Sequence, residues 1–317
     1  MKISAVVCTF NEETNMAPLI KSLKDCDEII IDDDHSTDKT REIAKKMGAK
    51  VFLREDKSEN PIQKDIDNFI RKFGYKPSFT TKDVIRSMAE IRNKAMSYAK
   101  NDWVFFPDAD EIVSWDFKEI ERLQTMFDHI ECELIQTRDS KGNPISYNNI
   151  TKLFRRSLSR WEGINHEVIV GMGKIRLIHS SRMKINHYQL QKERRRDALI
   201  KNLEFSISRN NNPRDMLYLG REFFWMLEFE KAIKMFDFDI KYTDWLPEMA
   251  ESFFFKALCL QRLGKIDEAK MTILGAMSIN PNMRKAFILM SELTNPTYKQ
   301  EWLQYALSAN NRGVVFP

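Results

Sequence analysis

The stretch ISAVVCTFNEETNMAPLIKSLKDCDEIIIDDDHSTDKTREIAKKMGAKVFL, from Ile3 to Leu53, decides the fold class. Three apolar runs, typical of buried strands, alternate in it with two amphipathic segments, typical of helices. The runs are residues 3–10, 28–31 and 49–53, and the segments are residues 15–24 and 37–47. Ser36 is placed to cap the second helix and Gly48 to end it. This β-α-β-α-β order predicts a parallel sheet with right-handed crossovers, as in a Rossmann-like α/β domain.

The pattern changes after this stretch. Residues 54–82 are polar and charged, with one amphipathic stretch, and they form either a mobile loop beside a site or a surface insertion. A helix over 83–99, a strand over 102–111 and a helix capped by Ser114 are expected next. Four β-like pieces then follow without a long helical pattern between them, at residues 133–138, 150–155, 166–170 and 182–187. The α/β half therefore continues into a mixed-sheet lobe.

From residue 192 onward the sequence is helical and repetitive. Pro213, Pro247 and Pro281 are spaced 34 residues apart, which is the period of the tetratricopeptide repeat. The clearest unit ends in LGKIDEAKMTILGAMSINP, and LEFEKAIKMF occupies the matching place one unit earlier. The part from residue 282 onward is either a degenerate third unit or a capping helix pair. We predict an α/β domain over residues 1–190 and an all-α repeat domain over 191–317.

The composition is that of a soluble globular protein, with 43% hydrophobic and 30% charged residues among 317. No apolar run approaches the roughly 20 residues that a membrane span needs. The first residues show no secretory signal, and the four cysteines form no CxxC pair, so we expect a cytoplasmic protein with free thiols. The net charge of +4 does not by itself indicate nucleic acid. The basic group at residues 192–196 is typical of a solvated helix face.

The candidate chemistry begins with the sequence PDADEI. Asp108 and Asp110 follow a predicted strand, at the sheet edge where open α/β sheets bind ligands. Two carboxylates one residue apart suit a hard divalent cation, Mn²⁺ or Mg²⁺, that bridges to phosphate oxygens. A polar turn with an Asp helix cap is the structural alternative, and D-x-D alone does not exclude it.

Polar residues also follow the first two strands, in CTFNEE (residues 8–13) and DDDHSTDKT (residues 32–40). Parallel strands end at the same edge of a sheet, so these segments and Asp108 are expected to lie together. A nucleoside fits this edge, with Phe10 against the base and a carboxylate on the base or ribose. An Asx turn is the alternative for Asp33 and Asp34.

Together, VVCTFNEE, EIIIDDDHSTDKT, IRNKAMSYAKNDWVFFPDADE and WEGINHE resemble family 2 glycosyltransferases. Bacterial and phage members of this family carry tetratricopeptide repeats after the catalytic domain. The resemblance covers residues 3–188, and the repeats extend it. It implies a GT-A fold, with a mixed central sheet, and metal-dependent sugar transfer from a nucleotide sugar, which we expect to be UDP-linked.

The resemblance also implies roles for individual residues. The base pocket would hold Cys8, Phe10 and Glu12; Asp33 would contact the base or ribose; Arg92 would lie near the diphosphate; Asp108 would contact the sugar or ribose; and Asp110 would hold the metal. His187, in the sequence INHY, is placed to be a further metal ligand, with a structural histidine as the equal alternative. The family pattern has an apolar residue and a glycine where this chain has Asp32 and His35.

The general base for an inverting transfer would come from WEGINHE. The family pattern keeps a His-Glu pair here, so we assign the base to Glu167 and its orientation to His166. Glu162 is the other acid of the motif. Trp161 either covers the sugar or packs in the core. Inversion itself is implied by the resemblance alone.

Two rival functions agree less well with the sequence. A protein-interaction scaffold with a catalytically silent first domain is opposed by the presence of all four polar site residues, Asp33, Arg92, Asp108 and Asp110. A nucleotidyltransferase would need a glycine-rich loop after the first strand, and CTFNEETN has no glycine. The acceptor stays open between a protein or peptide in the repeat groove, an envelope glycan and, less favoured, a modified DNA base. The repeats would alternatively form a homodimer.

Overall fold

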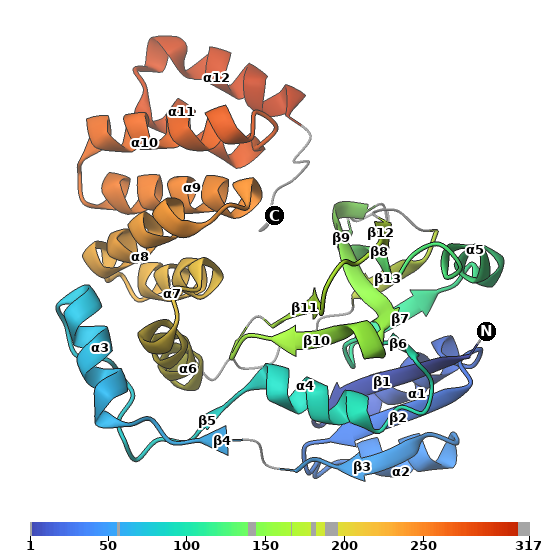
Figure 1. The fold of residues 1–317 in the computed structure, drawn as a ribbon. Coiled ribbons are helices and arrows are strands. Elements are labelled where there is room, and N and C mark those ends of the chain that lie inside the picture. Colours follow the sequence, from blue (N-terminus) through green and yellow to red (C-terminus); the bar gives the residue numbers. More distant parts are fainter. Residues whose placement is uncertain are drawn as a thin grey trace. The chain divides into compact units, whose positions relative to one another are not determined.

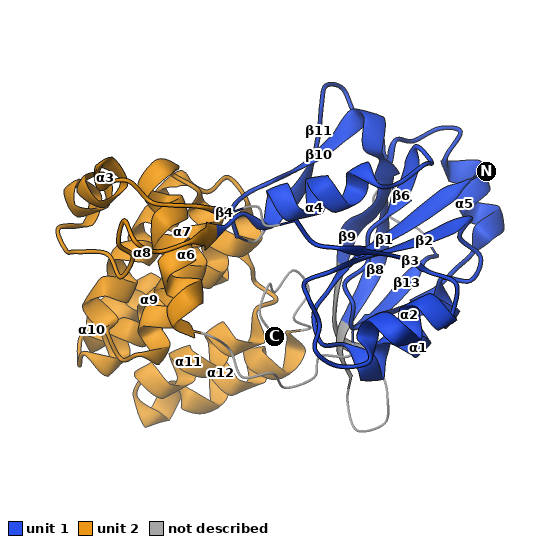
Figure 2. Ribbon diagram, turned by 90° about the horizontal axis from the view of Figure 1, so that it is seen from below, with its two compact units in different colours: residues 1–58, 86–193 blue, residues 59–85, 194–317 orange. Residues whose placement is uncertain are grey.

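The computed structural model describes residues 2–55, 58–138, 144–165, 167–178, 182–187 and 196–309. Its contacts divide the chain into two compact units (Figure 2). Unit 1 holds residues 1–58 and 86–193, and unit 2 holds residues 59–85 and 194–317. The last boundary lies close to the division expected at residue 190. The segment 59–85 differs from the expectation, because it groups with the helical unit and not with the first domain.

Unit 1 is built on one mixed sheet with the strand order β3-β2-β1-β6-β9-β8-β13-β7, and β12 pairs with β8 (Figure 1). The strands are β1 (Ile3–Thr9), β2 (Glu28–Asp33), β3 (Lys50–Leu53), β6 (Trp103–Phe105), β7 (Glu111–Ser114), β8 (His129–Arg138), β9 (Pro144–Arg155), β12 (Leu177–Ile178) and β13 (Lys184–His187). The first half, from β3 to β6, is parallel, whereas β9 runs antiparallel to both β6 and β8. Two small sheets pair β10 (Ser159–Glu162) with β11 (Val168–Gly171) and β4 (Ser58–Glu59) with β5 (Ile85–Arg86).

Apolar cores lie on both faces of the parallel strands. The helices of unit 1 are α1 (Glu13–Ser22), α2 (Thr40–Lys46), α4 (Met88–Ser97) and α5 (Phe117–Leu123). Val7 and Ile31 pack with residues of α1, α2 and α5, such as Leu19. Val6 and Ile30 point to the opposite face, where they pack with residues of α4 such as Ala95. Burial on both faces explains why these strands read as continuous apolar runs.

Several element boundaries differ from the sequence expectation. The helix expected at residue 37 begins at Thr40, and Ser36 does not cap it; instead, the Ser36 hydroxyl donates to Asp33. Ser114 is the last residue of β7, and Asp116 caps α5 by accepting from the Glu119 amide. Pro107 interrupts the single strand expected over 102–111, so β6 and β7 are separated by a turn.

Apart from Glu59 and Ile85, which belong to the short strands β4 and β5, the regular elements described in unit 2 are helices. Its helices are α3 (Gln63–Phe73), α6 (Arg196–Arg209), α7 (Pro213–Trp225), α8 (Phe229–Tyr242), α9 (Leu246–Arg262), α10 (Ile266–Ile279), α11 (Arg284–Leu293) and α12 (Pro296–Ser308). The helices from α7 to α12 stack as antiparallel pairs (Figure 1). A Cβ at Gly220 of α7 would meet the Phe236 ring at 2.6 Å, so this glycine permits the close approach of the first pair.

These observations confirm the predicted fold class: a Rossmann-like α/β domain with a mixed central sheet, of the GT-A kind, followed by tetratricopeptide-like helical repeats. The region from residue 282 onward forms the helix pair α11 and α12. Among the described residues, none of the helices has the length and apolarity that crossing a membrane requires.

Candidate active site

Several of the residues singled out from the sequence lie at the carboxyl ends of β1, β2 and β6 or directly after them. These three strands are parallel neighbours, with Thr9 beside Asp33 and Ala5 beside Phe105. The segment after each strand therefore emerges at one edge of the sheet, as Figure 1 shows for the strands themselves. Asp108 and Asp110 lie in the turn between β6 and β7 at this edge.

Arg92, on α4, links two of the predicted motifs. One of its terminal nitrogens donates to Asp108 Oδ1 at 2.8 Å, and its Nε donates to Glu167 Oε1. The guanidinium carbon lies 5.1 Å from the Phe106 ring centre and 4.9 Å from that of Trp161. Burial opposes the charged form of Arg92, but Asp108 and Glu167 outweigh it and raise its pKa. Arg92 is therefore a fixed cation with a planar fork held between aromatic rings.

Lys152, on β9, is a site residue that the sequence analysis missed. Its Nζ lies 2.8 Å from Asp108 Oδ2 and 3.2 Å from Glu111 Oε2, and Glu111 also accepts from the Asp108 backbone amide at 2.8 Å. Burial opposes the charge on Lys152, and the two carboxylates overcome it and raise its pKa. The alternation of side chains along the strand could have revealed it, because Lys152 lies two residues before the core residue Phe154 and therefore points to the same face of the sheet. A lysine at an inward position indicates a buried partner.

The two carboxyl groups beside Lys152, those of Asp108 and Glu111, have pKa values shifted in opposite directions. Burial favours the neutral form of Asp108, but Lys152 and Arg92 lower its pKa well below the usual range. Burial also acts on Glu111, and there it prevails, raising the pKa to about 7. Asp108 is thus a permanent anion held by two cations.

Asp110 and His187 meet on the other side of the same turn. β13 pairs antiparallel with β7, which sets His187 opposite Glu111 and brings its Nε2 to 3.2 Å from Asp110 Oδ2. The hydrogen bond to Asp110 raises the pKa of His187. The two residues predicted as metal ligands are therefore in direct contact, although 77 positions separate them in the chain.

The donor atoms at this pair fit a divalent cation that also binds phosphate. Within the described ranges, no group of three or more His, Cys, Asp or Glu side chains is arranged to hold a metal ion. Mg²⁺ is commonly held by one or two carboxylates together with substrate phosphates, and Mn²⁺ also accepts oxygen ligands. A cation held by one carboxylate and one imidazole would have its remaining coordination positions open to other oxygen ligands.

The end of β1 and the residues directly after it carry the side chains expected to line a base pocket. Cys8 is half-buried, and desolvation of its thiol raises the pKa to about 12; the thiol is close enough to Arg92 and Asp108 for their charges to act on it. Phe10 is 45% exposed and so offers an accessible aromatic ring. Glu12 is buried and accepts from the Asn15 side-chain amide at 2.9 Å. Cys8, Phe10 and Glu12 thus place a thiol, an exposed aromatic ring and a hydrogen-bonded carboxylate at the carboxyl end of β1.

The acids after β2 have separate roles in the structure. Asp33 is fully buried, and its carboxylate accepts from the Ser36 amide at 2.8 Å and the Ser36 hydroxyl at 2.6 Å. This is the turn that was the alternative for Asp33, and its contact with a base or ribose stays a prediction. Asp34 is more open and pairs with Arg86 at 2.9 Å. His35 has φ of 57°, which explains the glycine at this position of the family pattern.

The motif WEGINHE is described except for His166, which lies outside the described residues. Glu167 joins the site through Arg92, whereas Glu162 pairs with Arg160 on the exposed side of β10. Trp161 is 7% exposed and packs against core rings, in line with its packing alternative. Asn93 bonds both backbone groups of Trp161, at 3.0 and 2.9 Å, which ties α4 to β10.

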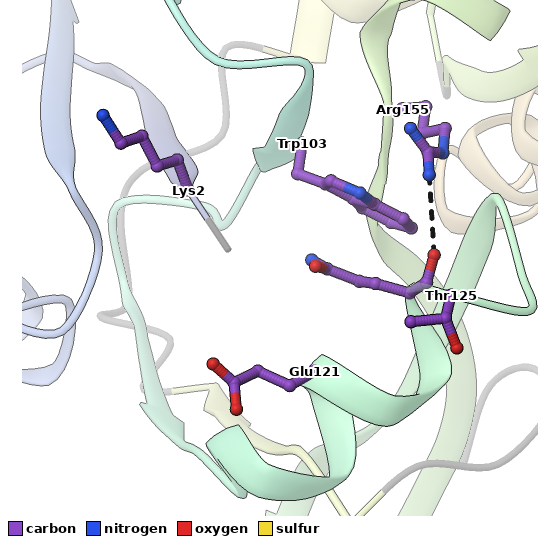
Figure 3. A pocket seen from close by; sticks show the side chains of 6 residues that line it. Lys2, Trp103, Glu121, Thr125 and Arg155 are labelled. Carbon is purple, nitrogen blue, oxygen red and sulfur yellow. Dashed lines mark hydrogen bonds between the residues drawn. The ribbon is translucent and has the colours of Figure 1, made fainter.

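A separate cleft lies away from these residues. Figure 3 shows it, with a volume of about 480 Å³ and a lining of Lys2, Trp103, Glu121, Gln124, Thr125 and Arg155. Lys2 precedes β1 and Trp103 is the first residue of β6, so the cleft is at the amino ends of the strands. It shares no residue with the site at the carboxyl ends.

Residues 4–63 match the family model described as Glycosyl transferase family 2. An uncharacterized glycosyltransferase of Rickettsia conorii is 30% identical over 168 residues, which are 50% of this chain and 49% of the relative. A counterpart from Rickettsia bellii is 29% identical over 168 residues, 50% of this chain and 47% of its own. The chain thus spans about half of the length of these two relatives.

Among solved structures, the whole chain aligns with S. aureus TarS 1-349 in complex with UDP-GlcNAc, at 14% identity and a TM-score of 0.42, over 93% of that chain. This likeness is weak.

Proposed function

We propose that the chain is a metal-dependent glycosyltransferase that moves a sugar from a UDP-sugar to an acceptor with inversion. One observation carries the proposal: Arg92 joins Asp108 of the PDADEI motif to Glu167 of WEGINHE, beside the Asp110–His187 pair. The two motifs are far apart in sequence, and a catalytically silent scaffold has no need of their convergence. The family 2 match of residues 4–63 supports the same proposal.

Asp110 and His187 would hold a Mn²⁺ or Mg²⁺ ion, which stabilises the negative charge of the departing diphosphate when it is bound. Asp108 accepts hydrogen bonds from Arg92 and Lys152 and keeps lone pairs for a sugar or ribose hydroxyl. Cys8, Phe10 and Glu12 line the side of the edge that receives the base. The donor therefore lies with its diphosphate toward Asp110 and its base toward the end of β1.

Glu167 is the proposed general base. Its carboxylate is paired with the Arg92 guanidinium, which holds it at the site where it would accept the proton of the acceptor. The acceptor hydroxyl gives its proton to Glu167, its oxygen bonds the anomeric carbon, and the bond from that carbon to the diphosphate oxygen breaks. The sugar passes through an oxocarbenium-like state, and a single displacement of this kind inverts the anomeric centre.

The acceptor is proposed to be a protein or peptide, because helical repeats present long surfaces that suit extended chains. An envelope glycan is the second acceptor class, and modified DNA is the least favoured. Incubation of the chain and a radiolabelled UDP-sugar with proteins, lipid-linked glycans and DNA in parallel separates these classes. Label in the glycan or DNA fraction alone would overturn the protein acceptor.

The variant Asp110→Ala tests the enzymatic proposal. We expect it to abolish metal-dependent turnover, because it removes the one carboxylate assigned to the metal. The melting temperature should change by only about 2 °C or less, since the side chain is part-exposed and supports no core contact.

Asp116→Ala is the matched control, because Asp116 caps α5 away from the site. It should lose about 1 kcal/mol of stability and keep its turnover. Loss of folding in Asp110→Ala, or full turnover, would contradict the assignment.

A further inference from the structure

Lys152 is the residue whose place in the structure is least expected from its chemistry. Its side chain is only 4% exposed, although lysine is almost never fully buried unless it is paired. The ammonium contacts Asp108 at 2.8 Å and Glu111 at 3.2 Å, and the Glu111 side chain is 2% exposed. A buried charge of this kind is stable only with such partners, and the partners need it equally.

The local charges show what Lys152 balances. Asp108 uses one carboxylate oxygen for Arg92 and the other for Lys152, and Arg92 is also shared with Glu167. Without Lys152, the part-exposed Asp108 carboxylate and the buried Glu111 carboxyl group would be linked only through the Asp108 backbone amide. Negative charges this close to each other repel, and the buried position of Glu111 limits the screening by water.

The backbone places Lys152 to act on the turn that carries the D-x-D motif. β9 pairs antiparallel with β6, and the Phe106 amide donates to the Lys152 carbonyl at 2.8 Å. Main chain and side chain of Lys152 therefore hold the two ends of the segment from Phe106 to Asp108. Asp110, two residues on, is held by His187 instead.

We propose that Lys152 is a positioning residue for the nucleotide-sugar donor, and this proposal rests on the proposed function. Its ammonium group pairs with both Asp108 and Glu111. These contacts keep Asp108 at the carboxyl edge of the sheet, where the donor would bind, and leave Asp110 available to the metal. Its role is charge compensation, and compensation can be restored by removing a negative charge.

The test compares Lys152→Met, Glu111→Gln and the double variant that combines them. Methionine keeps the length of the chain without its charge, and glutamine is nearly isosteric with glutamate. In the double variant the side-chain amide introduced at position 111 can donate to the Asp108 oxygen that Lys152 leaves. Lys184→Met on β13 is the control, because this lysine is 55% exposed and pairs with Glu133 at 3.3 Å, away from the D-x-D turn.

The readouts are the melting temperature and the affinity for UDP with Mn²⁺, measured by titration calorimetry. We expect Lys152→Met to bind about 10-fold or more weakly and to melt lower, because one partner of a buried pair is lost. The double variant should recover most of both losses, and Lys184→Met should resemble wild type.

Each further outcome has a meaning. A double variant that is no better than Lys152→Met, or that fails to fold, shows that Lys152 serves packing and overturns the proposal. A Lys152→Met variant that does not fold, beside a double variant that folds and binds, supports it. A wild-type chain that never binds UDP with Mn²⁺ contradicts the proposed function instead, and the recovery of melting temperature then still reports on the charge balance.

Discussion

At the scale of single residues, Arg92 shows how geometry and charge act together. Its guanidinium contacts Asp108 and Glu167 and lies against the rings of Phe106 and Trp161. A planar fork can make both ion pairs and stack at the same time, whereas a lysine ammonium is a single point charge. Arg92 is therefore not replaceable by another cation.

The variant Arg92→Lys should lower kcat/KM at least about 10-fold, since one of the two carboxylates loses its partner in a buried setting. Steady-state kinetics with a UDP-sugar measure this. Lys94→Met, on the same helix, is the control, because the Lys94 pair with Glu55 is open to solvent and such pairs contribute little. Equal kinetics for the two variants would contradict the bridging role.

The sequence predicted the convergence of Arg92, Asp108, Asp110 and His187, because strand ends and a family pattern place such residues together. It did not predict Lys152, which is 44 positions from Asp108 and meets it only through the pairing of β9 with β6. Register across a sheet is a property of the folded chain and not of a local motif.

At the scale of elements, α3 was the least predictable part of the chain. Its amphipathic pattern indicates that one face is buried but does not say against which element. The structure packs Phe69 and Phe73 into the helical core with Leu203 and Ile207, and Arg209 pairs with Asp65 at 3.1 Å. Residues 59–85 therefore belong to the helical unit, and neither the mobile loop nor the simple surface insertion describes α3.

Truncating the buried face of α3 should destabilise this unit. Phe69 is 0% exposed, so Phe69→Ala should cost about 3–5 kcal/mol in the free energy of unfolding. Ile70→Ala is the matched control on the same helix, because Ile70 is 39% exposed, and it should cost under about 1 kcal/mol. Urea unfolding followed by circular dichroism measures both, and equal costs would place α3 outside the helical core.

A buried acid in α8 makes the helical unit sensitive to pH. Asp239 is 0% exposed, and its partners are the Ser252 hydroxyl from α9 and the charges of Glu248 and Arg214. Burial raises its pKa to about 7, against about 3.9 in an unfolded chain. The unfolded chain thus ionises first, and stability falls as the pH rises from about 4 to 7.

Asp239→Asn should remove that loss. At pH 8 the variant should be more stable than wild type by about 2 kcal/mol, and near pH 4 the gain should vanish. Asp237→Asn, at a half-exposed position of the same helix, should change stability by less than about 0.5 kcal/mol at either pH. Urea unfolding at pH 4 and pH 8 measures the difference, and a gain that does not depend on pH would rule out titration of Asp239.

At the scale of the whole molecule, the order of apolar runs and the 34-residue spacing of prolines were sufficient to predict two architectures in one chain. The two-residue period of a strand, the period of a helical turn and the period of a repeat are each set by residues close together in the sequence. They can therefore be recognised without knowing any tertiary contact. Residues 59–85 belong to the helical unit through contacts with residues far away in the sequence, so no local pattern predicts this grouping. The identity of the acceptor is likewise absent from any local pattern.

The central claim is that a divalent cation and a UDP-sugar bind together at the carboxyl edge of the unit 1 sheet. Its most direct test is a thermal-shift titration of the full chain with UDP-, GDP-, CMP- and dTDP-sugars, with Mn²⁺ or with EDTA. Ligand that binds the folded chain raises the melting temperature as its concentration exceeds its Kd. We predict a rise with a UDP-sugar and Mn²⁺ that disappears in EDTA and in Asp110→Ala. No rise with any donor, or the same rise in EDTA and in Asp110→Ala, would contradict the claim.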